Sequence, residues 1–225
     1  MRIGILGGSF NPPHKMHFKM GLDLINKGYV DKIIYVPTGS KYKYKNNLIE
    51  DEHRFKMLEL MIKNDSRFEV SDYELKDYVV YTCDTLKYFK EMYPNDDIYF
   101  VCGADNLSYV DEWKNGIFLL ENYRFLVIKR YTDDIDEILK RYDKYRDNII
   151  ISDVEPDSLS STEIRNRIKN SEDIFIHGSK TNGAIKTYTG PITMTISAQE
   201  ALVVFSPKTK QFEETQDFNK AKQLF

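Results

Sequence analysis

Short apolar, β-branched runs alternate over residues 1–151 with stretches whose apolar residues recur at helical spacing. The strands predicted by this pattern are Ile3–Leu6, Lys32–Val36, Arg67–Val70, Asp97–Cys102, Arg124–Ile128 and Asn148–Ile151. The predicted helices are Phe18–Asn26, Glu52–Ile62, Asp84–Met92 and Asp136–Tyr145. Continuously apolar strands are typical of a parallel sheet that helices cover on both faces. The sequence therefore predicts an α/β fold with a doubly wound parallel sheet.

This regular alternation ends near Asn170, which predicts one domain over residues 1–170 and a C-terminal extension over 171–225. In the extension we expect turns with two strands, followed by a polar helix over Glu213–Leu224. An oligomerisation element, a lid and a lineage-specific tail all remain open as its role.

Composition narrows the class of protein. The net charge of −3 over 225 residues argues against a dedicated nucleic-acid binder, which is usually basic. Cys83 and Cys102 form neither a CxxC pair nor a zinc spacing, so we expect two buried, reduced thiols. No signal peptide or membrane-spanning run is apparent. We therefore expect a cytoplasmic protein without nucleic-acid or membrane partners, and the sequence leaves a homo-oligomer open.

Residues 7–17, directly after the first predicted strand, read GGSFNPPHKMH. Small residues there let backbone N–H groups approach an anion closely, and the helix that follows adds its positive N-terminal end. The segment contains neither GxxxxGK[ST] nor GxGxxG. It predicts a phosphate site of a different kind.

His14 and His17 distinguish this segment. Residues three apart at the start of a helix project to the same side, so both imidazoles are expected to face the phosphate pocket. A surface or capping role is the alternative for either histidine alone. Zinc binding is disfavoured because no third ligand occurs at a suitable spacing.

A second candidate phosphate motif, Ser160-Ser161-Thr162 with Arg165, follows the last predicted strand. Taken alone it also fits a helix capping box. The two interpretations are compatible, because a capped helix start is itself an anion site and the arginine fork matches phosphate geometry.

These two motifs resemble the [HT]xxH and ISSTxIR signatures of nucleotidylyltransferases. Three elements between them resemble the nicotinate/nicotinamide mononucleotide adenylyltransferase family: Gly103-Ala104-Asp105, Trp113 and the YTCDT segment 81–85. The resemblance covers roughly residues 1–170, and Met16 stands where many members carry Gly. It implies a Rossmann-like nucleotidylyltransferase fold and adenylyl transfer from ATP to nicotinate or nicotinamide mononucleotide, without choosing between acid and amide.

The resemblance also implies roles for individual residues. His14, His17 and Arg165 would be catalytic. The implied ATP-binding residues are Gly8, Ser9, Phe10, His17, Gly103, Asp105, Ser160, Ser161, Thr162 and Arg165. The implied mononucleotide-binding residues are Ser9, Phe10, Lys43, Lys45, Thr82, Thr85 and Trp113. Mg²⁺ is the implied cofactor, held mainly by ATP phosphates and water with no dedicated protein ligands.

Several of these assignments have structural alternatives. Trp113 could be a core residue, Thr82 a helix N-cap, and the basic loop 41–45 a solvated surface. His53 and Arg54 match a family pair, and we expect them mainly to support structure. An adenylyltransferase for another phosphorylated acceptor, such as phosphopantetheine, and a non-catalytic nucleotide sensor are the alternative functions.

Overall fold

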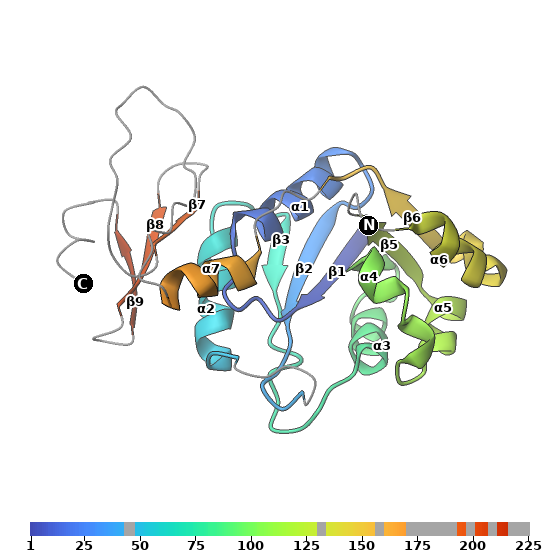
Figure 1. The fold of residues 1–225 in the computed structure, drawn as a ribbon, viewed down its shortest axis with the longest axis horizontal. Helices are drawn as coiled ribbons and strands as arrows, with labels where there is room; N and C mark the ends of the chain where they lie inside the picture. The colour runs from blue at the N-terminus through green and yellow to red at the C-terminus, as the bar shows by residue number, and fades with distance from the viewer. Residues whose placement is uncertain are drawn as a thin grey trace.

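A computed structural model describes residues 1–42, 48–129, 134–155, 160–169, 193–196, 201–206 and 211–215. Six strands form its main sheet: β1 (Arg2–Gly8), β2 (Lys32–Pro37), β3 (Phe68–Val70), β4 (Asp97–Gly103), β5 (Arg124–Ile128) and β6 (Ile149–Ser152). Their order is β3-β2-β1-β4-β5-β6, and each neighbouring pair is parallel (Figure 1). The predicted strands and the doubly wound α/β fold are confirmed.

The helices connect these strands. Seven α-helices are described: α1 (Lys15–Asn26), α2 (Asp51–Ile62), α3 (Thr82–Met92), α4 (Ala104–Leu107), α5 (Gly116–Asn122), α6 (Ile135–Arg141) and α7 (Ser161–Lys169). The predicted helix Asp136–Tyr145 divides into α6 and a 3-10 helix, Asp143–Asn148, while α4 and α5 are absent from the prediction. None of the helices in the described part of the chain is long and apolar enough to span a membrane.

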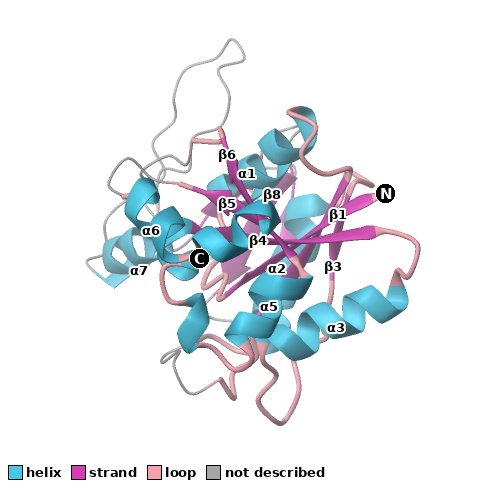
Figure 2. Cartoon of the chain, turned by 90° about the vertical axis from the view of Figure 1, so that its right-hand side faces the viewer, coloured by secondary structure: helices cyan, strands magenta, loops and turns pink. Residues whose placement is uncertain are grey.

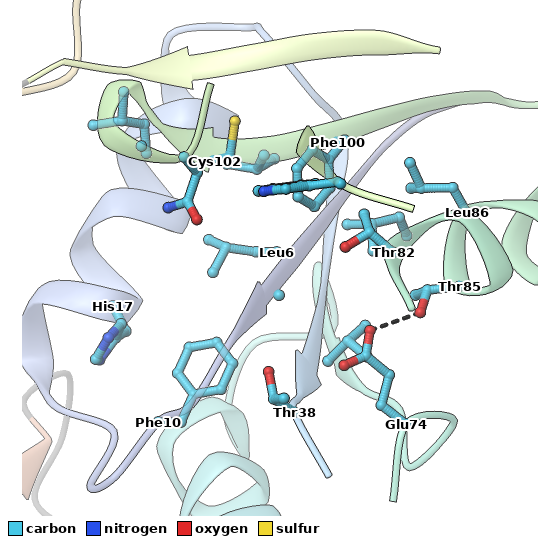
Figure 3. A pocket seen from close by; sticks show the side chains of 18 of the residues that line it. Leu6, Phe10, His17, Thr38, Glu74, Thr82, Thr85, Leu86, Phe100 and Cys102 are labelled. Atoms are coloured by element: carbon cyan, nitrogen blue, oxygen red, sulfur yellow. Dashed lines mark hydrogen bonds between the residues drawn. The ribbon is translucent and has the colours of Figure 1, made fainter. Parts of the chain in front are cut away.

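The strand order reverses between β1 and β4. From β1 the chain continues to β2 and β3 on one side, and it then returns to place β4 on the other. Ligands of open α/β sheets bind beyond the carboxyl ends of the strands at such a switch point. A pocket of about 290 Å³ lies there, with Gly7 of β1 and Gly103 of β4 in its wall (Figure 3).

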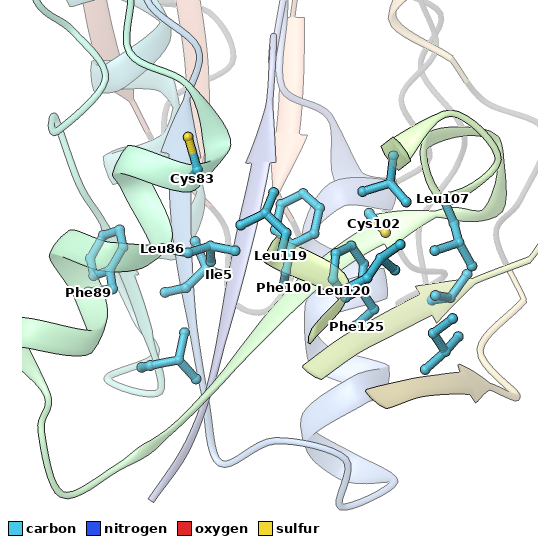
Figure 4. Packing of buried hydrophobic residues seen from close by; sticks show 14 of the residues in the cluster. Ile5, Cys83, Leu86, Phe89, Phe100, Cys102, Leu107, Leu119, Leu120 and Phe125 are labelled. Atoms are coloured by element: carbon cyan, nitrogen blue, oxygen red, sulfur yellow. The ribbon is translucent and has the colours of Figure 1, made fainter. Parts of the chain in front are cut away.

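Both faces of the sheet are buried. Along β2, Ile34 packs into one hydrophobic cluster, whereas Ile33 and Tyr35 pack into a second one. Because neighbouring side chains of a strand point to opposite faces, the clusters lie on the two sides of the sheet. The first cluster includes apolar residues of α3, α4 and α5 (Figure 4). The second cluster includes apolar residues of α1 and α2, two of the helices drawn in Figure 2. This packing fixes the strand ends that carry the candidate site.

The two cysteines belong to the first cluster. Cys83 is 6% exposed and Cys102 is 8% exposed, and neither forms a disulfide. Burial raises the pKa of both thiols above the usual value. The prediction of two buried, reduced cysteines is confirmed.

Beyond α7 the structure describes a separate antiparallel sheet with β7 (Thr193–Ile196), β8 (Ala201–Ser206) and β9 (Gln211–Thr215) in the order β7-β8-β9. This sheet therefore has three strands, where the sequence predicted two. The helix predicted over Glu213–Leu224 is wrong at its start, because Glu213–Thr215 pair with β8 instead. Residues 216–225 lie outside the described residues. The division at residue 170 stays a prediction.

Candidate active site

The loop between β1 and α1 folds back over the end of its own strand. Phe10 has a φ of 44°, in the left-handed region that few side chains adopt, and it is 2% exposed. Its ring covers Gly8, where a Cβ would lie 3.1 Å from the ring. It also meets the rings of His17 and Tyr35 edge-on. The turn thus places Phe10 in the pocket wall, next to His17.

The two histidines form one unit at the start of α1. His14 is the N-cap residue, and its backbone N–H donates a 3.1 Å hydrogen bond to Nδ1 of His17. The ring centroids are 3.8 Å apart. Because Nδ1 of His17 accepts this bond, the proton of its neutral imidazole lies on Nε2. The hydroxyl group of Tyr35 also fixes the backbone of His17, because it donates to the His17 carbonyl oxygen at 2.9 Å.

Both imidazoles are neutral at pH 7. Burial and, to a smaller extent, the neighbouring charge of Lys15 together lower the pKa of His14 to about 4. Burial and the proximity of His14 lower the pKa of His17 well below its usual value. Nδ1 of His14 is buried and has no hydrogen-bond partner among the described residues. A ligand oxygen or a water molecule can satisfy such a group, whereas leaving it bare costs stability.

Arg54 of α2 holds the loop between β1 and α1 in place. Its side chain is fully buried and donates to the carbonyl oxygens of Ser9 at 2.8 Å, Thr38 at 2.6 Å and Ile49 at 3.1 Å. Asp51, three residues earlier, pairs with the same guanidinium group. One charged group therefore ties the ends of β1 and β2 to α2, which confirms that Arg54 serves structure.

The second motif lies against the first. Ser161, the first residue of α7, donates from its hydroxyl to the carbonyl of Pro12 at 2.9 Å. Arg165 donates to the carbonyl of Asn11 at 2.7 Å and to the Thr162 hydroxyl at 2.9 Å. Segments about 150 residues apart in sequence thus meet at one place, where the N-terminal end of α7 faces the histidine loop.

The end of β4 contributes the Gly103-Ala104-Asp105 element. A Cβ on Gly103 would lie 2.2 Å from Oδ1 of Asp105, so a larger residue there would require this exposed carboxylate to turn away. Gly103 and Asp105 both line the pocket, and Ala104 is fully buried at the start of α4. The element thus places Gly103 and Asp105 in the pocket wall at the end of β4.

Trp113 lies on the pocket wall, as predicted. It follows a 3-10 helix, Val110–Glu112, and its ring meets Phe100 edge-on at 6.0 Å between centroids. Phe100 anchors the ring to the core, and both residues line the pocket. The core alternative and the binding role are both compatible with this placement, because Trp113 packs partly against the first hydrophobic cluster.

The YTCDT segment opens α3. Tyr81 is the N-cap residue and its backbone N–H donates to Asp84 at 3.2 Å, so the alternative of Thr82 as N-cap is wrong. Thr82 and Thr85 both line the pocket. Asp84 points away from the pocket wall to pair with Lys114, whose ammonium group lies 4.4 Å from the centre of the Tyr81 ring.

Glu74 is a pocket residue that the sequence interpretation missed. It lies between β3 and α3 and accepts a 2.6 Å hydrogen bond from the Thr85 hydroxyl. Burial raises the pKa of this carboxyl to about 7, against the opposing effect of the Thr85 hydrogen bond. No motif marks it, since a single Glu in a polar segment has no pattern of its own.

Figure 3 shows how the side chains divide around the pocket. His17 and Phe10 lie on one side, and Thr82, Thr85 and Glu74 lie on the opposite side. The predicted residues that line it are Phe10, His17, Thr82, Thr85, Gly103, Asp105 and Trp113. The predicted residues outside its lining are Gly8, Ser9, His14, Ser160, Ser161, Thr162 and Arg165, all of which belong to the two phosphate motifs. Lys43 and Lys45 lie outside the described residues.

No group of three His, Cys, Asp or Glu side chains among the described residues could hold a metal ion. A cation bound chiefly by phosphate oxygens and water needs no such group. The site is therefore compatible with a metal that arrives on a nucleotide.

Comparison with known proteins gives consistent matches. Residues 5–167 match the cytidylyltransferase-like family. A probable nicotinate-nucleotide adenylyltransferase of Clostridium novyi is 37% identical over 177 residues, which are 76% of this chain and 88% of that protein. Its counterpart in Fusobacterium nucleatum is 41% identical over 77% of this chain and 91% of that protein. The nicotinic acid mononucleotide adenylyltransferase of Plasmodium falciparum, solved with NaAD, matches with a TM-score of 0.64 and 26% identity over 76% of this chain and 86% of that one.

Proposed function

The chain belongs to the nicotinate-nucleotide adenylyltransferase family, and from this premise we propose that it transfers the adenylyl group of ATP to nicotinate mononucleotide. The products are the dinucleotide NaAD and pyrophosphate. The observation that carries the proposal is the pocket at the β1/β4 switch point. In Figure 3, Phe10 and His17 of the histidine loop lie across it from Thr82 and Thr85 at the start of α3. Trp113 lines the same pocket.

The reaction needs alignment more than acid–base chemistry. A phosphate oxygen of the mononucleotide attacks the α-phosphorus of ATP, a new P–O bond forms, and the bond to the bridging oxygen of pyrophosphate breaks. The attacking phosphate is already an anion, so no strong general base is required. What lowers the barrier is in-line placement and donors aimed at the charge that develops on the bridging oxygen.

His17 is suited to that task as a neutral donor. Nδ1 accepts from the backbone of His14, which leaves Nε2–H to donate into the pocket. A donor fixed by its own hydrogen bond costs no reorganisation during the reaction. His14 holds this geometry through its backbone, and we assign it a catalytic role on the strength of the sequence motif.

The triphosphate end of ATP would lie toward α7. Ser161 and Thr162 open α7, so the positive end of the helix dipole lies beside this motif, and Arg165 adds a fixed positive charge there. When bound with ATP, Mg²⁺ neutralises part of the phosphate charge. The described residues at the start of α7 would supply hydrogen-bond donors to the phosphate oxygens.

The mononucleotide would lie toward Trp113. A pyridinium ring stacked on an indole face gains about 0.5–2 kcal/mol, and Thr82 and Thr85 border the same end of the pocket. We also assign the mononucleotide phosphate to the basic loop that holds Lys43 and Lys45, on the strength of the sequence pattern.

Incubation with ATP, Mg²⁺ and each candidate acceptor tests the proposal. Nicotinate mononucleotide is expected to give NaAD and an equal amount of pyrophosphate. Product from phosphopantetheine alone would replace the proposal with a different adenylyltransferase. ATP binding without product from any acceptor would replace it with a nucleotide sensor.

The cytoplasmic location, the absence of nucleic-acid partners and the question of a homo-oligomer stay predictions of the sequence. Mass measured by light scattering for the full chain and for a chain ending at Lys180, together with activity, tests whether residues beyond 180 govern assembly or catalysis.

A further inference from the structure

Glu74 occupies a defined place in the pocket wall. A Cβ on Gly39 would lie 2.2 Å from the backbone carbonyl oxygen of Glu74, so the two chain segments are in close contact. This contact fixes the backbone from which the carboxyl group reaches the Thr85 hydroxyl at 2.6 Å (Figure 3). The carboxyl group is therefore held at the end of the pocket where α3 begins.

The Thr85 hydroxyl can pair with Glu74 in either protonation state, and its donation to the carboxylate favours the ionised form against the effect of burial. Thr85 is 2% exposed, and its hydroxyl lies within reach of both the Glu74 carboxyl and the Tyr81 carbonyl, at 2.6 Å and 3.3 Å. A hydroxyl has one proton to donate. If Glu74 is protonated, it donates to Thr85, which then donates to Tyr81, so both contacts are satisfied together. If Glu74 is ionised, the Thr85 proton serves only one of them.

Among the described residues, the pocket wall supplies no positive charge to Glu74. The other titratable side chains in the pocket wall are His17, Tyr42, Cys102 and Asp105. No Lys or Arg among the described residues lines the pocket. On the neighbouring segments, Asp84 pairs with Lys114, and Lys76 lies beside the ring of Tyr73.

These contacts give Glu74 two forms within the working range of an enzyme. Burial raises the pKa of its carboxyl group to about 7. A group that titrates there is half neutral and half anionic near neutral pH. A negatively charged ligand at this end of the pocket therefore lies near a neutral carboxyl group at low pH and near a carboxylate at high pH.

We infer that Glu74 sets the preference of the pocket between the acid and amide forms of the pyridine mononucleotide. The inference rests on the proposed function, which places the ring beside Trp113 and Thr85. When Glu74 is neutral, the ring carboxylate of the acid form can lie near it without charge repulsion. An ionised Glu74 repels that carboxylate, and it can accept a hydrogen bond from the amide form. Two like charges several ångströms apart in a partly desolvated pocket change affinity by about tenfold.

The experiment compares both mononucleotides at each pH from 6 to 8.5. The ratio of kcat/KM for the acid to kcat/KM for the amide is the measured quantity. Both substrates carry the same phosphate and use the same ATP site, so other titrations cancel in the ratio. For the unchanged protein the ratio is expected to fall about tenfold, with its midpoint near the Glu74 pKa of about 7.

Variants test whether the pH dependence of this ratio comes from the Glu74 side chain. Glu74→Gln keeps the size of the side chain and a donor for Thr85 but cannot ionise, so its ratio is expected to stay constant with pH. Glu74→Asp keeps an ionisable group and is expected to keep a pH-dependent ratio with a shifted midpoint. Glu69→Gln is the matched control, since this partly exposed carboxylate pairs with Lys32 on β2 and lies outside the pocket lining. It should reproduce the profile of the unchanged protein.

Two results would overturn the inference. One is a ratio that does not change with pH in the unchanged protein, a result that does not depend on whether any variant folds. The other is a falling ratio that Glu74→Gln preserves. Failure of the proposed function looks different, because then neither mononucleotide gives a dinucleotide at any pH.

Discussion

The backbone N–H of His14 donates to Nδ1 of His17, and this one hydrogen bond decides which ring nitrogen faces the pocket with a proton. The start of α1 therefore does two things with the same pair of residues. It satisfies a backbone donor that the helix leaves unpaired, and it orients Nε2–H of a neutral imidazole toward bound phosphate.

Replacement of His17 tests this arrangement. His17→Ala removes a preorganised donor and is expected to lower kcat by about 10²- to 10³-fold, with the circular dichroism spectrum unchanged. His17→Asn can keep the bond from the His14 N–H through its side-chain oxygen but loses Nε2–H. It is expected to melt near the temperature of the unchanged protein while turning over as poorly as His17→Ala.

His53→Ala is the matched control, because this histidine opens α2 beside Glu50 and does not line the pocket. Its turnover is expected to stay close to that of the unchanged protein. Turnover of His17→Ala at the same level as His53→Ala would remove His17 from the mechanism.

Much of this fold follows from local pattern, and the failures have physical causes. Strands β1, β2, β4 and β5 were predictable because each contains a run of apolar residues buried on both faces of the sheet. The helix α5 escaped prediction because it is short and begins after Asn115, whose left-handed φ of 58° no apolar period signals. The start of α1 was predicted at Phe18 rather than Lys15, since its first turn carries polar residues that serve the site.

The candidate site was predictable only where residues form motifs. His17, Gly103 and Trp113 belong to recognisable segments, and the structure places all three in one pocket. Glu74 could not be found this way, because its role depends on burial and on Thr85, eleven residues away in the chain. A perturbed carboxyl is a property of three-dimensional surroundings rather than of spacing.

Stability at mildly acidic pH tests the burial of His14. Its pKa is about 4 in the folded chain, below the usual value of 6.5, so between these values the unfolded chain binds a proton that the folded chain does not. Stability therefore falls as pH decreases from 6.5 toward 4, by about 3 kcal/mol at most. His14→Gln, which cannot titrate, is expected to lose this contribution.

The measurement is urea unfolding of both proteins at pH 7 and pH 5. Other titrating groups, Glu74 among them, are present in both proteins and cancel in the comparison. The unchanged protein is expected to lose more stability than His14→Gln between the two pH values. Equal losses would mean that His14 is not held neutral by burial.

Removal of the indole tests the mononucleotide side of the pocket. Trp113→Ala is expected to raise KM for the mononucleotide by about two- to thirtyfold, the equivalent of a stacking energy of 0.5–2 kcal/mol. KM for ATP should change little, because the triphosphate is assigned to the opposite side. Trp113→Phe keeps an aromatic face and should recover part of the loss. Phe118→Ala, at a side chain 50% exposed on α5, serves as the control.

Arg54 offers the sharpest test of how the site is supported. Arg54→Met keeps the length of the side chain but leaves the carbonyls of Ser9, Thr38 and Ile49 without their buried donor. It also leaves Asp51 without its partner. The expected loss in the free energy of unfolding is about 3–5 kcal/mol, measured in urea.

Arg67→Met provides the comparison, because Arg67 pairs with Asp65 on the surface, where its side chain is 43% exposed. Surface pairs of this kind contribute about 0–1 kcal/mol, so this variant should unfold near the urea concentration of the unchanged protein. The contrast depends on burial, since both arginines pair with an aspartate close in sequence. Equal losses from the two replacements would show that Arg54 does not carry the loop, and the position of Phe10 and His17 would then need another explanation.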